Sequence, residues 1–289
     1  MTKETRDPST LAEDIYKILE DETDHVVSED NVQWAGEVFK QLLRTRLAKR
    51  EEKRGDSVLR FSSLGKKDRQ IWYSAHMPEK AEKLPGKVKF KFLYGDLIEV
   101  LLLFLAREAG HEVTNEQYEV QEDGVLGHID AVIDGVLVDV KSASSYSYEK
   151  FKSGSYIFDD PFGYISQLSG YAHKTKSERA GFLVCDKTHG DIHFAELDPA
   201  YIKANAPGPR IKELRRVLAD ETPPPRCYPD QEEGKSGNRK LGVSCSYCPF
   251  KEECWKESNG GKGLRKFFYS RGPVWLTEVK KAPLVPEAN

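Results

Sequence analysis

Residues 127–141 read GHIDAVIDGVLVDVK and contain two β-rich runs joined by Asp134-Gly135. An Asp-Gly pair between such runs is typical of a two-residue hairpin turn, whose central positions both need a positive φ. If these two residues form the turn, counting outward along the strands places Asp130 opposite Asp139. The stretch therefore predicts a β-hairpin that brings two carboxylates together.

The two faces of this hairpin differ in character. The predicted core face carries only apolar side chains: Ile129, Ala131, Ile133, Val136, Val138 and Val140. The other face carries Asp130 opposite Asp139, and His128 opposite Lys141. Directly opposed residues have Cβ atoms roughly 4.5 to 5.5 Å apart, so the two carboxylates repel each other. A hard divalent cation such as Mg²⁺, which takes carboxylate oxygens, relieves that repulsion.

A third acid comes from the segment before the hairpin. Residues 94–109 read as a helix that is apolar nearly all round and ends at Gly110. Glu99 lies inside this apolar cylinder, and burying an unpartnered carboxylate costs several kcal/mol. We therefore expect Glu99 to meet a cation or a water-filled cleft, with Gly95, one turn earlier, leaving room for it.

Three acids and one lysine in one place suit phosphodiester hydrolysis. Carboxylates on adjacent strands can hold one or two metal ions against a scissile phosphate, where the ions stabilise negative charge and acidify the attacking water. Lys141 is then placed to orient or deprotonate that water, or to neutralise the phosphate in the transition state.

The rest of the chain alternates between helical and extended patterns. The expected helices are residues 9–20, 30–53, 94–109, 162–176 and 199–219, and the expected extended segments are residues 87–92, 112–120, 126–133, 136–142, 180–186 and 190–197. This order predicts an α/β fold with a central mixed sheet flanked by helices. A run of three prolines, residues 223–225, then breaks the chain before a loop-rich, cysteine-bearing segment.

Composition limits the classes of function. The chain has 289 residues and a net charge of -3, so any nucleic-acid surface must be local. The longest apolar run, Val100–Ala106, is too short to span the roughly 30 Å of hydrocarbon in a membrane. The first sixteen residues lack the apolar stretch of a secretory signal, so we expect an intracellular, cytoplasmic protein with no membrane partner.

Four of the five cysteines predict a metal module. Cys245, Cys248 and Cys254 form a C-x2-C-x5-C pattern, and Cys227 lies upstream. Four thiolates can close a tetrahedral zinc site or hold a [4Fe-4S] cluster, and the chemistry alone leaves both open. Cys185, in an apolar strand, is most simply a buried thiol.

These residues resemble the PD-(D/E)xK nuclease superfamily, in particular its RecB-like exonuclease branch, over roughly residues 60 to 256. The resemblance implies a restriction-endonuclease-like core in which Glu99, Asp130, Asp139 and the backbone carbonyl of Val140 bind Mg²⁺ or Mn²⁺. It implies that Lys141 is the catalytic lysine. Gln167 and Tyr171, in QLSGY, match the downstream Gln-x-x-x-Tyr motif and share one helix face, where they hold a DNA strand or orient Lys141.

The resemblance extends to both ends of the core. Residues 62–65, followed by Arg69 and Trp72, resemble the segment that leads into the core of these nucleases. AddB-type and CRISPR-associated RecB-like nucleases carry a similar C-x2-C-x5-C around an iron-sulfur cluster. There the fourth cysteine precedes the core, whereas residues 60–72 of this chain contain none. The resemblance thus implies a [4Fe-4S] cluster on Cys227, Cys245, Cys248 and Cys254, with Zn²⁺ as the alternative.

The sequence therefore predicts an N-terminal helical region (1–59), a RecB-like nuclease core (60–222) and a C-terminal cysteine module with its tail (223–289). The expected function is a metal-dependent deoxyribonuclease, an exonuclease acting on DNA ends or single-stranded segments in recombination, repair or viral DNA metabolism. Recombination or replication proteins are its expected partners, and phage exonucleases in bacterial hosts belong to the same resemblance. A structure-specific endonuclease with the same core and a non-catalytic zinc-containing DNA-binding module are the alternatives.

Overall fold

The computed structural model describes residues 6–21, 25–48 and 59–288. The chain divides into two compact units, Met1–Gly65 with Leu84–Ile211, and Lys66–Lys83 with Lys212–Asn289. Residues 66–83, which the sequence analysis placed in the nuclease core, thus group with the cysteine-bearing segment. No helix within the described part of the chain is long and apolar enough to cross a membrane.

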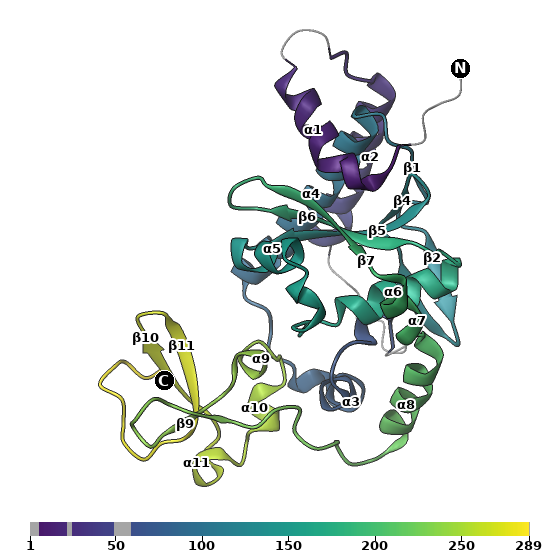
Figure 1. Cartoon of the computed structure of the whole chain (residues 1–289). Helices are drawn as coiled ribbons and strands as arrows, with labels where there is room; N and C mark the ends of the chain where they lie inside the picture. Colours follow the sequence, from purple (N-terminus) through teal and green to yellow (C-terminus); the bar gives the residue numbers. More distant parts are fainter. Residues whose placement is uncertain (1–5, 22–24, 49–58, 289) are drawn as a thin grey trace. The chain divides into compact units, whose positions relative to one another are not determined.

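The first unit is built on a five-stranded sheet with the order β1-β4-β5-β6-β7 (Figure 1). Its strands are β1 (Val113–Thr114), β4 (Ala131–Ile133), β5 (Val136–Ala143), β6 (Ala180–Asp186) and β7 (Ile192–Leu197). β5 and β6 run parallel, and the other neighbours run antiparallel. The parallel pair needs a crossover, and α5 and α6 supply it. The predicted α/β class with a mixed sheet is confirmed.

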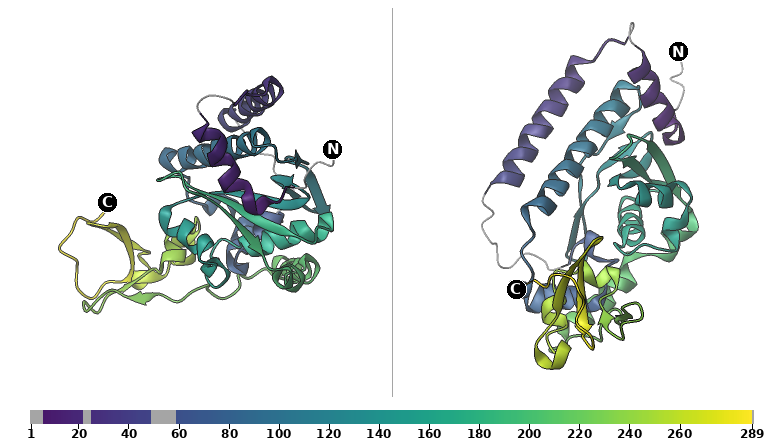
Figure 2. Two further views of the ribbon diagram at one scale, coloured as in Figure 1. Left: turned by 45° about the horizontal axis from the view of Figure 1, so that its top comes forward. Right: turned by 90° about the vertical axis from the view of Figure 1, so that its left-hand side faces the viewer.

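Helices cover both faces of this sheet. The helices of this unit are α1 (Leu11–Glu20), α2 (Glu29–Leu47), α4 (Gly86–Glu108), α5 (Ser145–Lys152), α6 (Tyr164–Thr175) and α7 (Pro199–Ala204). The chain then continues through α8 (Pro207–Ala219), which extends into the second unit. Figure 1 shows α1 and α4 on one face and α5 and α6 on the other. Figure 2 shows α2 running alongside α4. Residues from α1, α4 and the sheet form one apolar core, which includes Ile15, Leu102, Val138 and Leu183.

The hairpin has the predicted turn and register. Asp134 and Gly135 have φ angles of 49° and 81°, as a two-residue turn of this kind requires. Ile133 pairs with Val136 and Ala131 with Val138. All six residues of the predicted core face are buried. Leu137 and Asp139, on the other face of β5, are buried as well, so this strand is covered on both faces.

The prediction that His128 faces Lys141 is wrong. The expected strand 126–133 is two strands, because β3 (Val125–His128) leaves the main sheet and pairs with β2 (Glu119–Glu122). His128 lies opposite Glu119 in that two-stranded sheet. The ladder between β4 and β5 ends at the pair of Ala131 and Val138. Two residues further along β5, the Val140 N–H donates to the Asp130 side chain at 2.8 Å instead of to a backbone carbonyl of the opposite strand.

The extended segment predicted at residues 87–92 is also wrong. These residues form the first turns of α4, which begins directly after Pro85 and continues through the helix predicted at residues 94–109. Phe90 and Phe92 are exposed, so the alternation of lysine and apolar residues does not mark a buried face. The helix ends as expected, with Gly110 at a φ of 85°.

The second unit contains short helices and a four-stranded sheet with the order β10-β11-β9-β8. Its helices are α3 (Asp68–His76), α9 (Val243–Ser246), α10 (Lys251–Cys254) and α11 (Ser258–Gly261), and its strands are β8 (Gln231–Glu232), β9 (Arg239–Lys240), β10 (Arg265–Tyr269) and β11 (Gly272–Glu278). Trp72, Tyr73 and Phe250 form its apolar cluster, against which Cys248 and Cys254 pack.

One close backbone contact in the first unit can be tested by substitution. A Cβ atom added at Gly65 would lie 2.2 Å from the Cα of Gly163, the residue before α6, and the backbone there cannot move without displacing the helix. We expect Gly65→Ala to lower the free energy of unfolding by about 2 kcal/mol or more, measured by urea titration. Gly36→Ala, on α2 with nothing within 4 Å, is the control and should stabilise by up to ~1 kcal/mol. Equal effects would contradict the contact.

Candidate active site

Asp139 and Lys141 lie on the same face of β5, two residues apart. The Asp139 side chain is 2% exposed, and the Lys141 ammonium forms an ion pair with its Oδ2 atom. The same ammonium lies 4.7 Å from the centroid of the Tyr164 ring. Burial by itself lowers the pKa of Lys141, but the charges of Asp139 and Asp130 outweigh it and raise that pKa above its ordinary value. The lysine is therefore held as a cation.

Asp130 is positioned by the strand opposite it. Its Oδ2 atom accepts a hydrogen bond of 2.8 Å from the Val140 N–H. Burial raises the pKa of Asp130 well above its usual range, and the charges of Asp139 and Glu99 raise it further. In a strand, the N–H and C=O of one residue point to the same side, so the Val140 carbonyl also lies on the Asp130 side.

Glu99 reaches the cluster from α4. Its Oε1 atom accepts a hydrogen bond of 2.7 Å from the Gln117 amide. Burial, followed by the charges of Asp139 and Asp96, raises the pKa of Glu99 to about 7. A Cβ atom at Gly95 would lie 3.1 Å from Ser142 Oγ, so the room that Gly95 leaves is occupied by β5 itself.

The donor set fits a hard divalent cation. Three carboxylates share the site with one ammonium, and burial, followed by the charges of the neighbouring carboxylates, raises the pKa values of Glu99 and Asp130. The carboxylate oxygens of Glu99, Asp130 and Asp139 do not all lie within 4.8 Å of one another. Within the described residues, the one group of three His, Cys, Asp or Glu ligand atoms lying within 4.8 Å of one another is in the β6–β7 turn: Asp186, His189 and Asp191. Sequence reasoning did not identify that turn.

Hydrogen bonds within the β6–β7 turn already occupy the Asp186 carboxylate. Its Oδ1 atom accepts from the Thr188 N–H at 2.9 Å, and its Oδ2 atom lies 2.8 Å from His189 Nδ1. The pKa of Asp186 falls to about 2 because these hydrogen bonds outweigh its desolvation. The turn is thus stabilised by its own side chains.

Gln167 and Tyr171 lie on one face of α6, as their spacing predicts. The Gln167 amide donates to the Tyr171 hydroxyl at 3.3 Å. Burial raises the pKa of Tyr171 to about 12, and the phenol also feels the charges of Asp139, Asp130 and Lys141. Tyr164 belongs to the same face, three residues before Gln167, and its contact with Lys141 was not predicted although the helical spacing contains the signal.

Residues 61–65 hold this helix in place. The Phe61 ring lies 5.2 Å from the Tyr171 ring, and a Cβ atom at Gly127 would lie 2.6 Å from the same tyrosine. Gly127 therefore gives Tyr171 the space that it occupies. Arg69 and Trp72, which the resemblance grouped with this segment, belong to α3 in the second unit.

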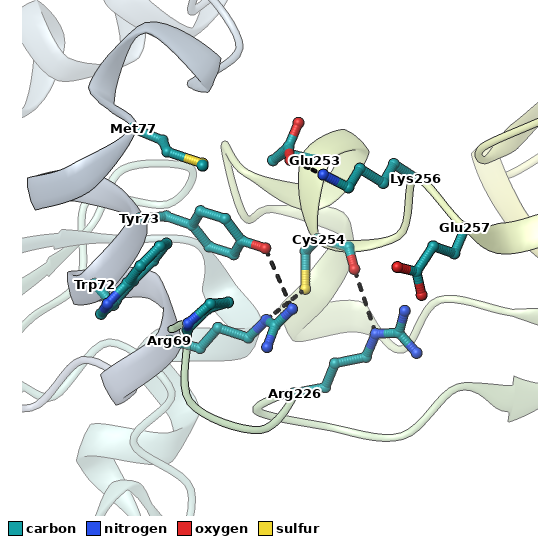
Figure 3. Close-up of a pocket in the computed structure, with 10 residues that line it drawn as sticks. Arg69, Trp72, Tyr73, Met77, Arg226, Glu253, Cys254, Lys256 and Glu257 are labelled. Carbon is teal, nitrogen blue, oxygen red and sulfur yellow. Dashed lines mark hydrogen bonds and ion pairs between the residues drawn. The ribbon is translucent and has the colours of Figure 1, made fainter. Parts of the chain in front are cut away.

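The four C-terminal cysteines lie within the second unit, and each is partly buried. Burial, together with the charges of the other three thiols, raises the pKa of Cys245 to about 11. The Arg69 Nε–H donates to Cys254 Sγ at 3.2 Å (Figure 3). This contact joins residues 185 positions apart, so no local pattern could predict it. Cys185, expected to be buried, is partly buried in β6.

Cys254 borders a cavity of about 230 Å³, which Figure 3 shows. Arg69, Trp72 and Tyr73 line it from α3, and Arg226 lines it from the proline-rich segment. The Arg226 Nε–H donates to the Cys254 carbonyl at 3.3 Å. Two guanidinium groups therefore bracket the main chain and the sulfur of this cysteine.

No protein-family model matches the sequence, and no curated protein matches it. Several solved structures are similar to the chain. The crystal structure of SSO0001 is 15% identical, with a TM-score of 0.40, over 75% of this chain and 94% of that chain. An alkaline exonuclease from Laribacter hongkongensis is 17% identical (TM-score 0.39; 62% and 94%). A phage-related exonuclease from Haemophilus somnus 129PT is 14% identical (TM-score 0.35; 55% and 91%).

The raised pKa of Glu99 makes stability depend on pH. Between the unfolded pKa near 4.5 and the folded pKa of about 7, the folded state binds more protons than the unfolded state, so metal-free stability falls as pH rises through this window. We expect Glu99→Gln to flatten this fall, measured by urea unfolding in EDTA at pH 5 to 8. Glu37→Gln, on α2, is the control and should keep the wild-type slope. An unchanged slope in Glu99→Gln would contradict the raised pKa.

Proposed function

We propose that this protein is a metal-dependent deoxyribonuclease of the PD-(D/E)xK type that processes DNA ends. The observation that carries the proposal is the convergence of Glu99, Asp130 and Asp139 with Lys141 at the β4–β5 hairpin. Three carboxylates around one buried ammonium suit a divalent ion and an anionic substrate better than they suit a structural ion pair.

In this proposal, Glu99, Asp130, Asp139 and the Val140 carbonyl hold one or two Mg²⁺ or Mn²⁺ ions. The bound ion supplies charge stabilisation at the phosphate and a more acidic water. Asp130 is oriented for this by the Val140 N–H, and Glu99 by the Gln117 amide. Both hydrogen bonds leave one oxygen of each carboxylate to bind a ligand.

Lys141 acts as a fixed cation in this mechanism. Its raised pKa keeps the ammonium protonated at neutral pH, so it serves to position the attacking water and to stabilise the negative charge on the phosphate. Gln167 and Tyr171 stand beside this cluster as a hydrogen-bonded pair, with the amide donating to the phenol. The phenol O–H remains free to donate to a phosphate oxygen of the strand.

We also propose that Cys227, Cys245, Cys248 and Cys254 bind a [4Fe-4S] cluster with a structural role. A zinc ion with Zn–S distances of about 2.3 Å brings its sulfurs to ~3.8 Å of one another. Among the described cysteines, no three sulfur atoms all lie within 4.8 Å of one another. The choice of the cluster over zinc rests instead on the resemblance of the C-x2-C-x5-C pattern to that of iron-sulfur nucleases. Arg69 would stabilise the Cys254 thiolate through its hydrogen bond.

Lys141→Ala tests the catalytic proposal. Loss of the ammonium removes charge stabilisation at the phosphate, so we expect Mg²⁺- or Mn²⁺-dependent cleavage of linear DNA to fall about a hundredfold or more, with DNA binding nearly unchanged. Lys174→Ala, an exposed lysine on α6, is the matched control and should cleave normally. Full cleavage by Lys141→Ala would rule out the assigned role.

A covalently closed circle distinguishes end processing from internal cutting. An enzyme that needs an end degrades the linear form and spares the closed circle. Gel analysis of both forms with Mg²⁺ or Mn²⁺ should show this difference. Cleavage of the circle at a comparable rate would replace the exonuclease by an endonuclease with the same site.

The cysteine proposal makes a separate spectroscopic prediction. Protein purified without oxygen should be brown, absorb near 400 nm and contain iron. Cys248→Ala should lose this absorbance. It should also melt at a lower temperature, because Cys248 packs against the apolar side chains of Trp72, Tyr73 and Phe250, which the bound iron-sulfur group would help to hold in place. Cys185→Ser, in the first unit, should keep the absorbance. A colourless protein that contains zinc would overturn the assignment.

A further inference from the structure

A second cavity, of about 250 Å³, opens beside the proposed catalytic lysine. It lies in the first unit, between the end of β5, the start of α5 and the segment that precedes α6. Lys141 and Tyr164 line it, and both also belong to the carboxylate site. A ligand in this cavity would therefore lie directly beside the group that acts on the scissile phosphate.

Aromatic rings form one wall of this cavity. The Phe162 and Tyr164 rings lie 5.4 Å apart at an angle of 27°, and both line the cavity. Phe162 is 56% exposed, so a large part of its apolar ring is available to a ligand. Phe158, four residues earlier and 89% exposed, does not line the cavity. The exposed ring that faces the cavity is thus Phe162.

The charged side chains around the cavity favour an anion. Asp160 is occupied by three backbone N–H groups, those of Gly163, Tyr164 and Ile165, and Asp159 is paired with Lys150. Lys187 also lines the cavity and forms no ion pair with any residue that the structure describes. Its positive charge is therefore available to a ligand, beside the first turn of α5.

We propose that this cavity binds one unpaired nucleotide of the substrate strand, with its base against Phe162 and Tyr164 and a phosphate near Lys187. The inference rests on the proposed nuclease function and specifies its substrate. A base inside a duplex is stacked on both faces and paired at its edge, so it must leave the stack to enter a cavity of this size. The enzyme consequently acts on strands that are single or frayed at the cutting position.

Binding measurements without metal test the proposal independently of cleavage. Fluorescence anisotropy in EDTA compares labelled single-stranded and blunt duplex oligonucleotides. Phe162→Ala should weaken single-strand binding by about tenfold, the usual effect of one lost stacking platform, and should change duplex binding little. Phe162→Leu keeps an apolar side chain without the ring, so its affinity for single strands should lie between those of wild type and Phe162→Ala. Phe158→Ala is the matched control and should bind as wild type.

Lys187→Gln tests the phosphate contact. It should weaken binding to single strands of any sequence. The slope of log affinity against log salt concentration should become shallower by about 1, the value for one lost phosphate contact. An unchanged salt slope would remove Lys187 from the site. Equal losses for single strands and duplexes in Phe162→Ala, or no loss for either, would overturn the nucleotide cavity.

The outcomes separate this inference from the nuclease proposal. If wild-type protein binds single strands through Phe162 but cleaves nothing with any divalent metal, the cavity stands and the nuclease proposal fails. If it cleaves DNA and Phe162→Ala cleaves single strands as well as wild type, the nuclease proposal stands and the cavity fails. If wild-type protein binds no DNA, both fail.

Discussion

The burial of like charges at one hairpin is the constraint on which the site depends. Asp139 lies on β5, Asp130 directly precedes β4, and Glu99 joins them from α4. Lys141 pairs with Asp139, while burial, followed by the charges of the neighbouring carboxylates, raises the pKa values of Glu99 and Asp130. Replacing a buried group of charges by well-packed apolar residues is often neutral or stabilising, so folding stability does not account for this cluster. Our proposal assigns to the cluster an ion and a substrate, whose charges would balance those of the buried groups.

The surrounding fold is arranged to hold these groups rigidly. Asp139 and Lys141 sit on a central strand whose apolar residues are buried against α1 and α4. Asp130 is fixed by a backbone N–H of that strand, and Tyr171 by Phe61 and by the space at Gly127. Hydrogen bonds and packing thus set the positions of side chains that come from separate parts of the chain. The proposed nucleotide cavity shares Lys141 and Tyr164 with the cluster, so a nucleotide bound there would lie beside these charged groups.

Local chemistry explains which features the sequence could predict. The Asp134-Gly135 turn and its register follow from two-residue periodicity and positive φ, and the Gln167–Tyr171 pair follows from helical spacing. The same reasoning failed at His128, because the Asp130 side chain ends the ladder by accepting the Val140 N–H. It also failed at residues 87–92, where a long helix overrides a short alternation. The contact of Arg69 with Cys254 and the Phe162 cavity come from tertiary packing and have no local signal.

A crystal of the protein grown with Mn²⁺ would test the central claim most directly, because manganese can be located by its anomalous scattering. The account predicts a strong peak surrounded by carboxylate oxygens of Glu99, Asp130 and Asp139. The Lys141 ammonium should remain beside this peak. A peak only at the Asp186, His189 and Asp191 turn, or none within reach of Asp130 and Asp139, would contradict it.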